Sequence, residues 1–190
     1  KGGLIQLTRS IALEYGRDIG YGSSLALSDA ILSLYMVSPE LAEANPMYKE
    51  NVDAMYKRFR QEDLIMAIAM SDTKGDRSLH PGQQKDPDLY VRKVAERDDG
   101  IVLRGMKAHI SGAAFLHKLV VMPTKRMKPD ESDYSVTCLI SPGTPGVKLI
   151  MRPRRMTGSQ FEYPLSYGDV GGECFVWLDD VFVPWERVIQ

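Results

Sequence analysis

The sequence predicts an α+β protein in which a helical part precedes a β-rich part. Up to about residue 69, apolar side chains recur at the spacing of an amphipathic helix. From about residue 88 the spacing becomes two, which is the period of a strand with one buried face. Proline and glycine separate the later apolar runs at short intervals, which favours antiparallel strands over a doubly wound sheet. We therefore expect a helical segment over 1–69 and an antiparallel barrel or sandwich over 70–190.

Three helices are expected in the first part. Leu4–Tyr15 forms a short candidate, followed by a glycine-rich break. Ser24–Val37 has good helix formers, an internal run free of proline and glycine, and serine at its start as a cap. Ser38-Pro39 is expected to end this helix or to start a new turn. Asn45 and Pro46 then predict a third helix that runs toward residue 69, with asparagine as N-cap and proline at the first helical position.

The second part predicts a series of short strands. Arg97-Asp98-Asp99-Gly100 lies between two strand-like runs, and Asp-Gly at such a place predicts a hairpin. The expected strands are Asp88–Glu96, Gly100–Lys107, His117–Met122, Asp133–Ile140, Val147–Met151 and Cys174–Val183.

Composition excludes several classes of protein. A net charge of −1 over 190 residues argues against partners held by bulk charge, such as nucleic acid or an anionic membrane. No apolar run is long enough to span a bilayer, and no signal segment opens the chain. Two cysteines, Cys138 and Cys174, are too few for a disulfide framework and favour thiols in a reducing, cytoplasmic compartment. The ends of the sequence suggest a fragment of a longer protein.

Common catalytic fingerprints are absent from the sequence. It has no G-x-G-x-x-G after a strand, no P-loop and no G-x-S-x-G elbow. Its three histidines do not have the spacing of metal ligands. A nucleotide-binding dehydrogenase, an NTPase, a serine hydrolase and a simple zinc enzyme are therefore disfavoured.

Met70–Arg77 is the first candidate site, because it joins the helical and β-rich parts through a polar, glycine-bearing stretch. Short polar side chains and successive backbone amides at such a junction suit a ring edge or a pyrophosphate. Lys74 and Arg77 can neutralise phosphate charge. A solvated linker is the alternative. The candidate cofactor-binding residues here are Met70, Ser71, Asp72, Thr73, Lys74, Asp76 and Arg77.

Two further stretches combine chemically active groups at the ends of strands. Lys107–Ala113 holds a cation, His109 and Ser111, and Gly112 beside them lets a planar ligand approach the backbone. Gly171-Gly172-Glu173 precedes a strand and offers a carboxylate as a general base if burial raises its pKa. A strand-ending turn and a solvated glutamate are the respective alternatives.

The order and spacing of several segments resemble the flavoprotein family of the 4-hydroxyphenylacetate 3-monooxygenase oxygenase component and 4-hydroxybutyryl-CoA dehydratase. These segments cover most of the chain from about Asp63 onward. They are Ala69–Arg77, Asp86–Asp88, Asp99–His109, Val121–Thr124, Asp133–Val136, Thr144–Val147 and Asp179–Arg187.

This resemblance implies an acyl-CoA dehydrogenase-like fold: a helical N-terminal domain ending in 1–69, a β-barrel FAD-binding domain over 70–190, and a C-terminal helical bundle beyond the chain. It also implies FAD or reduced FAD as cofactor, a homotetramer and a small-molecule substrate. Family flavin contacts fall on Met70–Arg77 and on Lys107–Ser111. The forms Lys-Gly-Asp-Arg and Lys-Ala-His are nearer the dehydratase branch, where Ser111 stands for a threonine near the flavin and Glu173 for a catalytic glutamate.

The sequence also departs from both branches. Residues 20–30 contain no cysteine, where the dehydratase has two iron–sulfur ligands, so a cluster of the usual kind is not expected from these positions. Ser23, Leu27 and Ile68 stand where the hydroxylase branch has an arginine, a tyrosine and a histidine. Three hypotheses follow: a dehydratase-like enzyme acting on a hydroxyacyl-CoA, a phenol monooxygenase supplied by a flavin reductase, or a paralogue without enzyme activity that binds flavin.

Overall fold

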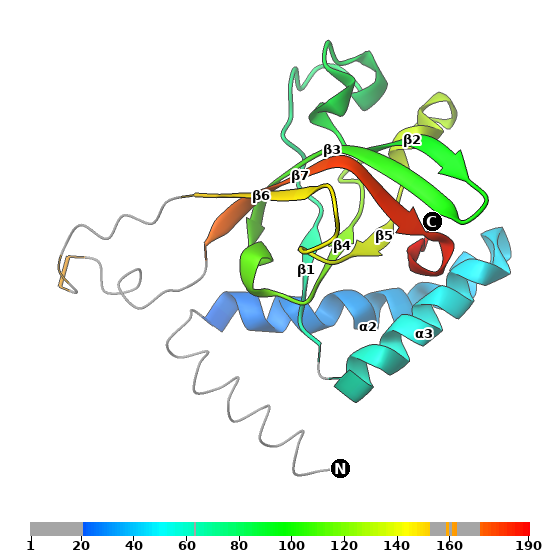
Figure 1. Cartoon of the computed structure of the whole chain (residues 1–190), viewed down its shortest axis with the longest axis horizontal. Coiled ribbons are helices and arrows are strands. Elements are labelled where there is room, and N and C mark those ends of the chain that lie inside the picture. Colours follow the sequence, from blue (N-terminus) through cyan, green and yellow to red (C-terminus); the bar gives the residue numbers. More distant parts are fainter. Residues whose placement is uncertain (1–20, 63, 153–158, 160, 163–171) are drawn as a thin grey trace.

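The computed structural model describes residues 21–62, 64–152, 159, 161–162 and 172–190, and it shows a mixed α+β fold. Two helices lie side by side at one end of the molecule, and two β-sheets stack above them (Figure 1). The helix expected over Leu4–Tyr15 lies outside the described residues. Among the described residues, no helix is both long and apolar enough to cross a bilayer.

The helices confirm most of the sequence prediction. Helix α2 spans Tyr21–Ala44 and continues past Pro39, where the sequence suggested an end or a new turn. Pro39 has no N–H to give the Tyr35 carbonyl one turn earlier, and the Ser38 hydroxyl donates to that carbonyl instead, at 2.8 Å. Helix α3 spans Pro46–Glu62 and begins as predicted, with the Asn45 side chain accepting from the Met47 amide at 3.0 Å.

The larger sheet has four strands in the order β2-β3-β7-β6, all antiparallel. Strand β3 (Gly100–Ser111) and strand β7 (Glu173–Pro184) are the long central pair that arches across the molecule (Figure 1). Strand β2 (Arg92–Arg97) joins β3 through the predicted Asp98-Asp99 turn, and β6 spans Val147–Met151 as predicted. This sheet carries Lys107–Ser111 of the second candidate stretch at the end of β3, and Glu173 of the third stretch at the start of β7.

The smaller sheet has the order β1-β4-β5. Strand β1 (Met66–Ala69) pairs in parallel with β4 (Lys118–Val121), although the sequence suggested helix up to residue 69. Strand β5 covers only Cys138–Ile140, although the sequence predicted a strand over Asp133–Ile140, and the first two of those residues belong to the 3-10 helix Pro129–Tyr134. Both faces of this sheet are buried: one row of side chains packs against the larger sheet, and the other packs against α2 and α3.

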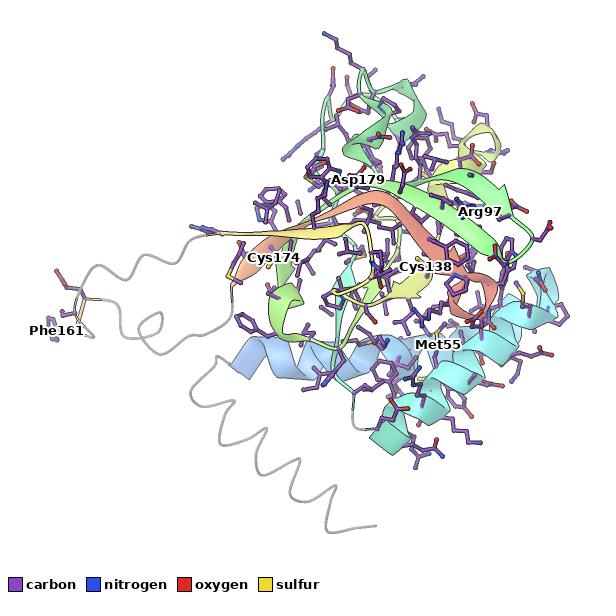
Figure 2. The ribbon with its side chains drawn as sticks, viewed as in Figure 1. Met55, Arg97, Cys138, Phe161, Cys174 and Asp179 are labelled. Carbon is purple, nitrogen blue, oxygen red and sulfur yellow. The ribbon has the colours of Figure 1, made fainter. Side chains whose placement is uncertain are left out.

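The expectation of a closed antiparallel barrel is wrong. A barrel closes only when its edge strands pair through backbone hydrogen bonds. In the described residues, the edge strands of one sheet form no ladder with those of the other, and β1 pairs with β4 in parallel. The sheets meet through apolar side chains from both, which form the main core. Figure 2 shows Cys138 inside the molecule and Cys174 near the start of β7; both thiols are free and buried.

Candidate functional site

The loop after β1 crosses strand β3, and this crossing brings two candidate stretches together. Asp72 and Lys107 form an isolated antiparallel bridge, and the Ala108 amide donates to the Ser71 carbonyl at 2.8 Å. Met70, which precedes the crossing, is partly exposed. The Ser71 carbonyl is therefore fixed against a long central strand, and the loop has a defined position there.

Lys107 is the anchor of this crossing. Its side chain is only 2% exposed, and its ammonium pairs with the Asp72 carboxylate. It also donates to the carbonyls of Met70 at 3.1 Å and Met122 at 2.8 Å. Burial lowers the pKa of Lys107, and the Asp72 charge opposes this shift. All three ammonium hydrogens thus have acceptors within the protein. Lys107 therefore has no hydrogen left to donate to a ligand, and its effect on a bound group comes from holding the loop in position.

A first cleft of about 250 Å³ opens beside this anchor. Asp72 lines this cleft, is 4% exposed, and accepts a hydrogen bond from the Thr124 hydroxyl at 2.6 Å. Tyr90 forms part of the wall and is 3% exposed. Burial raises the pKa of Tyr90, the Asp72 charge adds to the shift and the Arg77 charge opposes it. The other lining residues, Lys74, Arg77 and Lys125, carry positive charge.

The remaining loop side chains stabilise the loop itself. The Thr73 hydroxyl donates to the Leu89 carbonyl. Asp76 accepts from the Ser78 amide at 2.9 Å and from the Ser78 hydroxyl at 2.6 Å, and these bonds lower the pKa of the Asp76 carboxyl. The Asp76 backbone is held by the Gln84 side chain, which accepts from its amide and donates to its carbonyl. The loop thus presents its cations to the cleft on a well-braced backbone.

A β-bulge changes the direction of side chains at the end of β3. Lys107 pairs with Val176 and Ile110 pairs with Cys174, so two β3 residues stand opposite one β7 residue. His109, one of the two, has a φ of 57°, in the left-handed region. Its imidazole is 70% exposed, and Nδ1 lies 3.5 Å from Glu173 Oε2.

The three predicted catalytic residues meet at this end of the sheet. Ser111 and Glu173 are direct register partners on β3 and β7, although 62 positions separate them in the chain. Glu173 also lies 3.5 Å from Arg152, measured from Oε2 to Nη1. The structure therefore brings His109, Ser111 and Glu173 together, and it adds Arg152 to them.

A second cleft, of about 260 Å³, is lined by His109, Arg152 and Glu173 and by apolar side chains, and Ser111 is not among its lining residues. Its walls contain His109, Ile150, Met151, Arg152, Glu173, Cys174 and Phe175. The rings of His109 and Phe175 lie 6.0 Å apart, centroid to centroid. Ile150, Met151 and Phe175 expose much of their apolar surface. The cleft thus combines an apolar surface suited to a flat ring with a carboxylate flanked by two basic groups.

Sequence reasoning missed Tyr90, Lys125, Arg152 and Phe175. Thr124 lay inside one of the segments that carried the family resemblance, but no role was given to it. Tyr90 and Lys125 reach the first cleft only because the turns before β2 and after β4 fold beside the loop. Arg152 follows β6, and its amide donates to the Glu173 carbonyl at 2.9 Å. Such long-range placements have no local sequence signal. Of the third stretch, Gly171 lies outside the described residues.

Known proteins show the same pattern over most of this chain. Residues 8–190 match the family model described as 4-hydroxyphenylacetate 3-hydroxylase N terminal. A 4-hydroxybutyryl-CoA dehydratase/vinylacetyl-CoA-Delta-isomerase from Clostridium aminobutyricum is 38% identical over 74% of the chain and 30% of the relative. A 4-hydroxyphenylacetate 3-monooxygenase oxygenase component from Geobacillus sp. is 28% identical over 85% of the chain and 33% of the relative.

Solved structures of a dehydratase and of an oxygenase component are also similar to this chain. An oxygen-tolerant archaeal 4-hydroxybutyryl-CoA dehydratase from N. maritimus superposes with a TM-score of 0.77 at 32% identity, over 85% of this chain and 33% of that one. The oxygenase component of 4-hydroxyphenylacetate 3-monooxygenase, complexed with FAD and 4-hydroxyphenylacetate, gives 0.73 at 28% identity, with the same coverage. The chain spans about a third of the length of the relatives it matches. With a family model matching nearly its whole length, this chain belongs to the 4-hydroxyphenylacetate 3-hydroxylase family.

Proposed function

We propose that this chain is part of an FAD-dependent enzyme of the family, nearer the dehydratase branch, that acts on a hydroxyacyl-CoA. The observation that carries the proposal is the meeting of His109, Ser111 and Glu173 beside an apolar cleft, next to the braced loop of Met70–Arg77. The 38% identity to a 4-hydroxybutyryl-CoA dehydratase supports this branch.

The residues present fit a flavin. The Ser111 hydroxyl lies at the open end of β3 and can donate to a ring edge. The exposed apolar surfaces of Phe175, Ile150 and Met70 suit a flat aromatic system. We therefore assign the cofactor to the domain over 70–190, with the loop of Met70–Arg77 on one side and Lys107–Ser111 beside it. FAD bound there would supply an acceptor for electrons from the substrate.

Glu173 is the residue we assign to proton transfer. Its carboxylate is partly exposed and lies within 3.5 Å of both His109 and Arg152. A carboxylate at this position can accept a proton from a substrate, as a general base does. His109 can donate to the carboxylate or take the proton onward, and Arg152 can orient an acidic substrate group. Apolar Phe175 and Ile150 line the same cleft, so a bound substrate that covers them would keep water away from the carboxylate.

The second candidate function is phenol hydroxylation by a two-component monooxygenase. The specific support is the likeness to the oxygenase component solved with both FAD and 4-hydroxyphenylacetate. In that case a flavin reductase is the partner, and the second cleft holds a phenol. For either function we propose a homotetramer in the cytoplasm, completed by a helical bundle from the rest of the protein. An iron–sulfur cluster bound through residues 20–30 is not part of the proposal, because that stretch has no cysteine.

The test uses the intact protein that contains this chain. Anaerobic turnover of 4-hydroxybutyryl-CoA supports the dehydratase proposal, whereas oxygen consumption with reduced FAD and 4-hydroxyphenylacetate supports the monooxygenase. Glu173→Gln should lower kcat by about 10²–10⁴-fold in the active assay. Asp179→Asn, an exposed carboxylate on the same strand that pairs with Lys148, is the matched control. Intact protein that binds no FAD and turns over neither substrate would refute both functions.

A further inference from the structure

We propose that His80 and Glu131 form a pH-sensitive clasp that holds the outer half of the Met70–Arg77 loop, and that this clasp is tighter in mildly acidic than in mildly alkaline solution. The two residues are 51 positions apart, and they join the turn after the loop to the 3-10 helix Pro129–Tyr134. The effect of the clasp on a cofactor rests on the proposed function, because the loop is the proposed flavin contact. The clasp itself rests only on the contacts between the two segments.

Glu131 is a buried carboxylate with three donors around it. Its side chain is 6% exposed. The Gly82 amide donates to Oε1 at 3.1 Å, and the Lys128 amide donates to Oε2 at 3.3 Å. His80 Nδ1 lies 3.2 Å from Oε2 and provides the third contact. Because His80 and Gly82 both belong to the segment that follows the loop, the carboxylate ties that segment to the helix Pro129–Tyr134.

The tied segment in turn holds the loop. Pro81–Gln83 forms a single 3-10 turn, and Gln84, which follows it, is 9% exposed. The Gln84 side chain accepts from the Asp76 amide at 3.0 Å and donates to the Asp76 carbonyl at 2.8 Å. A Cβ built on Gly75 would lie 2.3 Å from Gln84 Oε1, so the loop backbone lies directly against this side chain. We therefore expect separation of His80 from Glu131 to loosen the loop at Asp76.

The charge of His80 sets the strength of the clasp. Burial raises the pKa of Glu131, but the Gly82 and Lys128 amides and His80 outweigh it and lower that pKa, so the carboxylate stays ionised at neutral pH. Histidine is the side chain whose charge changes between about pH 5 and 8. An imidazolium always has a hydrogen on Nδ1 and makes a charge-assisted bond to a carboxylate, whereas a neutral ring has a hydrogen on only one of its two nitrogens. Lowering the pH through this range should therefore tighten the clasp, and further acidification that protonates Glu131 should release it.

The other charged groups near the clasp are exposed or already paired. Arg92 and Asp88, whose charges act on the neighbouring Tyr134, pair with each other at 2.8 Å. The remaining charged side chains of the two segments are all exposed: Asp76, Arg77, Lys85, Lys128, Asp130 and Asp133. Solvent and salt screen exposed charges, so the pH response of the clasp comes from His80.

Hydrogen exchange in the intact protein tests the clasp without a cofactor. The amides that report on the loop are those of Asp76, which donates to Gln84, and of Ser78 and Leu79, which donate to Asp76. Charge-assisted bonds are about twice as strong as neutral ones, and the His80 ring is 36% exposed, so protection corrected for intrinsic exchange should rise about threefold from about pH 8 to about pH 6. His80→Gln and Glu131→Gln should each abolish this rise. His117→Gln, which removes a histidine that contacts the Ile65 amide just before β4, is the matched control and should keep the rise.

Release of FAD from the intact protein separates the clasp from the proposed function. If the loop holds the cofactor, the release rate should fall about threefold over the same pH interval, and it should stay constant in His80→Gln. Loop protection that does not change with pH, or that changes equally in His80→Gln, overturns the clasp. If the protection rises as expected but the protein binds no FAD, the proposed function fails and the clasp stands. If FAD binds but its release does not follow the protection, the effect of the clasp on the cofactor is overturned.

Discussion

Replacing Lys107 by methionine should destabilise the fold more than any surface substitution. The ammonium neutralises Asp72 and donates to the carbonyls of Met70 and Met122. Without it, a carboxylate that is 4% exposed keeps only the Thr124 hydroxyl, at 2.6 Å. Removing one partner of a buried pair costs about 3–5 kcal/mol. This is a large part of the stability of an ordinary domain, about 5–15 kcal/mol.

Urea unfolding at neutral pH, with the variants Lys107→Met, Asp72→Asn and the double variant, measures this effect. Because the double variant leaves no unpaired buried charge, its loss should be smaller than the sum of the single losses by about 1–3 kcal/mol. Lys93→Met, which breaks the exposed pair with Glu96, is the control and should cost about 0–1 kcal/mol. The reasoning is refuted if Lys107→Met lowers the free energy of unfolding no more than the control does. It is also refuted if the losses of the two single variants add up to the loss of the double variant.

Three further predictions concern other parts of the fold. Gly105→Ala should lower the free energy of unfolding, measured in urea, by about 3 kcal/mol or more. The reason is that the φ of 126° at Gly105 and the nearby Tyr90 carbonyl leave no room for a side chain. An alanine variant of normal stability would contradict this. Burial alone raises the pKa of Glu131, but hydrogen bonds from the Gly82 and Lys128 amides and from His80 outweigh it and lower that pKa. Glu131 therefore stabilises the fold above its unfolded value of 4.5, and the contribution is lost as the pH falls below it. Glu131→Gln should lower the free energy of unfolding by about 1.5 kcal/mol at pH 7, and the difference from the unsubstituted protein should disappear in acid. A difference that does not change with pH would exclude this role. Burial also raises the pKa of the Cys138 thiol to about 12, so a thiol reagent at pH 8 should label it only after unfolding, as mass spectrometry of the labelled peptide would show.

Features set by neighbouring residues were predictable from the sequence. The N-cap at Asn45 and the Asp98-Asp99 hairpin depend on a few adjacent residues, and both are present. The helix through Pro39 was not predicted, because it depends on the Ser38 hydroxyl replacing a lost donor. Strand β1 was missed because its partner β4 lies about 50 positions away and gives a short apolar run no local signature.

In the candidate site, too, the sequence predicted what depends on adjacent residues and missed what depends on distant contacts. The residues at the end of β3 and at Glu173 were proposed as separate stretches, and only the register of β3 with β7 reveals that they meet. The loop of Met70–Arg77 was marked by its polar composition. Its division into bracing residues such as Thr73 and cleft-lining residues such as Lys74 depends on tertiary contacts. A closed barrel was a wrong inference because alternating strand patterns do not specify which edges pair.

Lys107, His109 and Ser111 are all odd-numbered, and in a regular strand all three would project from the same face. The additional residue near Ala108 breaks this parity: Ile110 enters the interior that Lys107 also occupies, while His109 and Ser111 turn outward. One extra residue thus lets β3 place Lys107 in the interior and His109 and Ser111 on its outer side. The position should tolerate substitution better than removal of the extra residue, which would straighten β3 and abolish the left-handed backbone that directs His109.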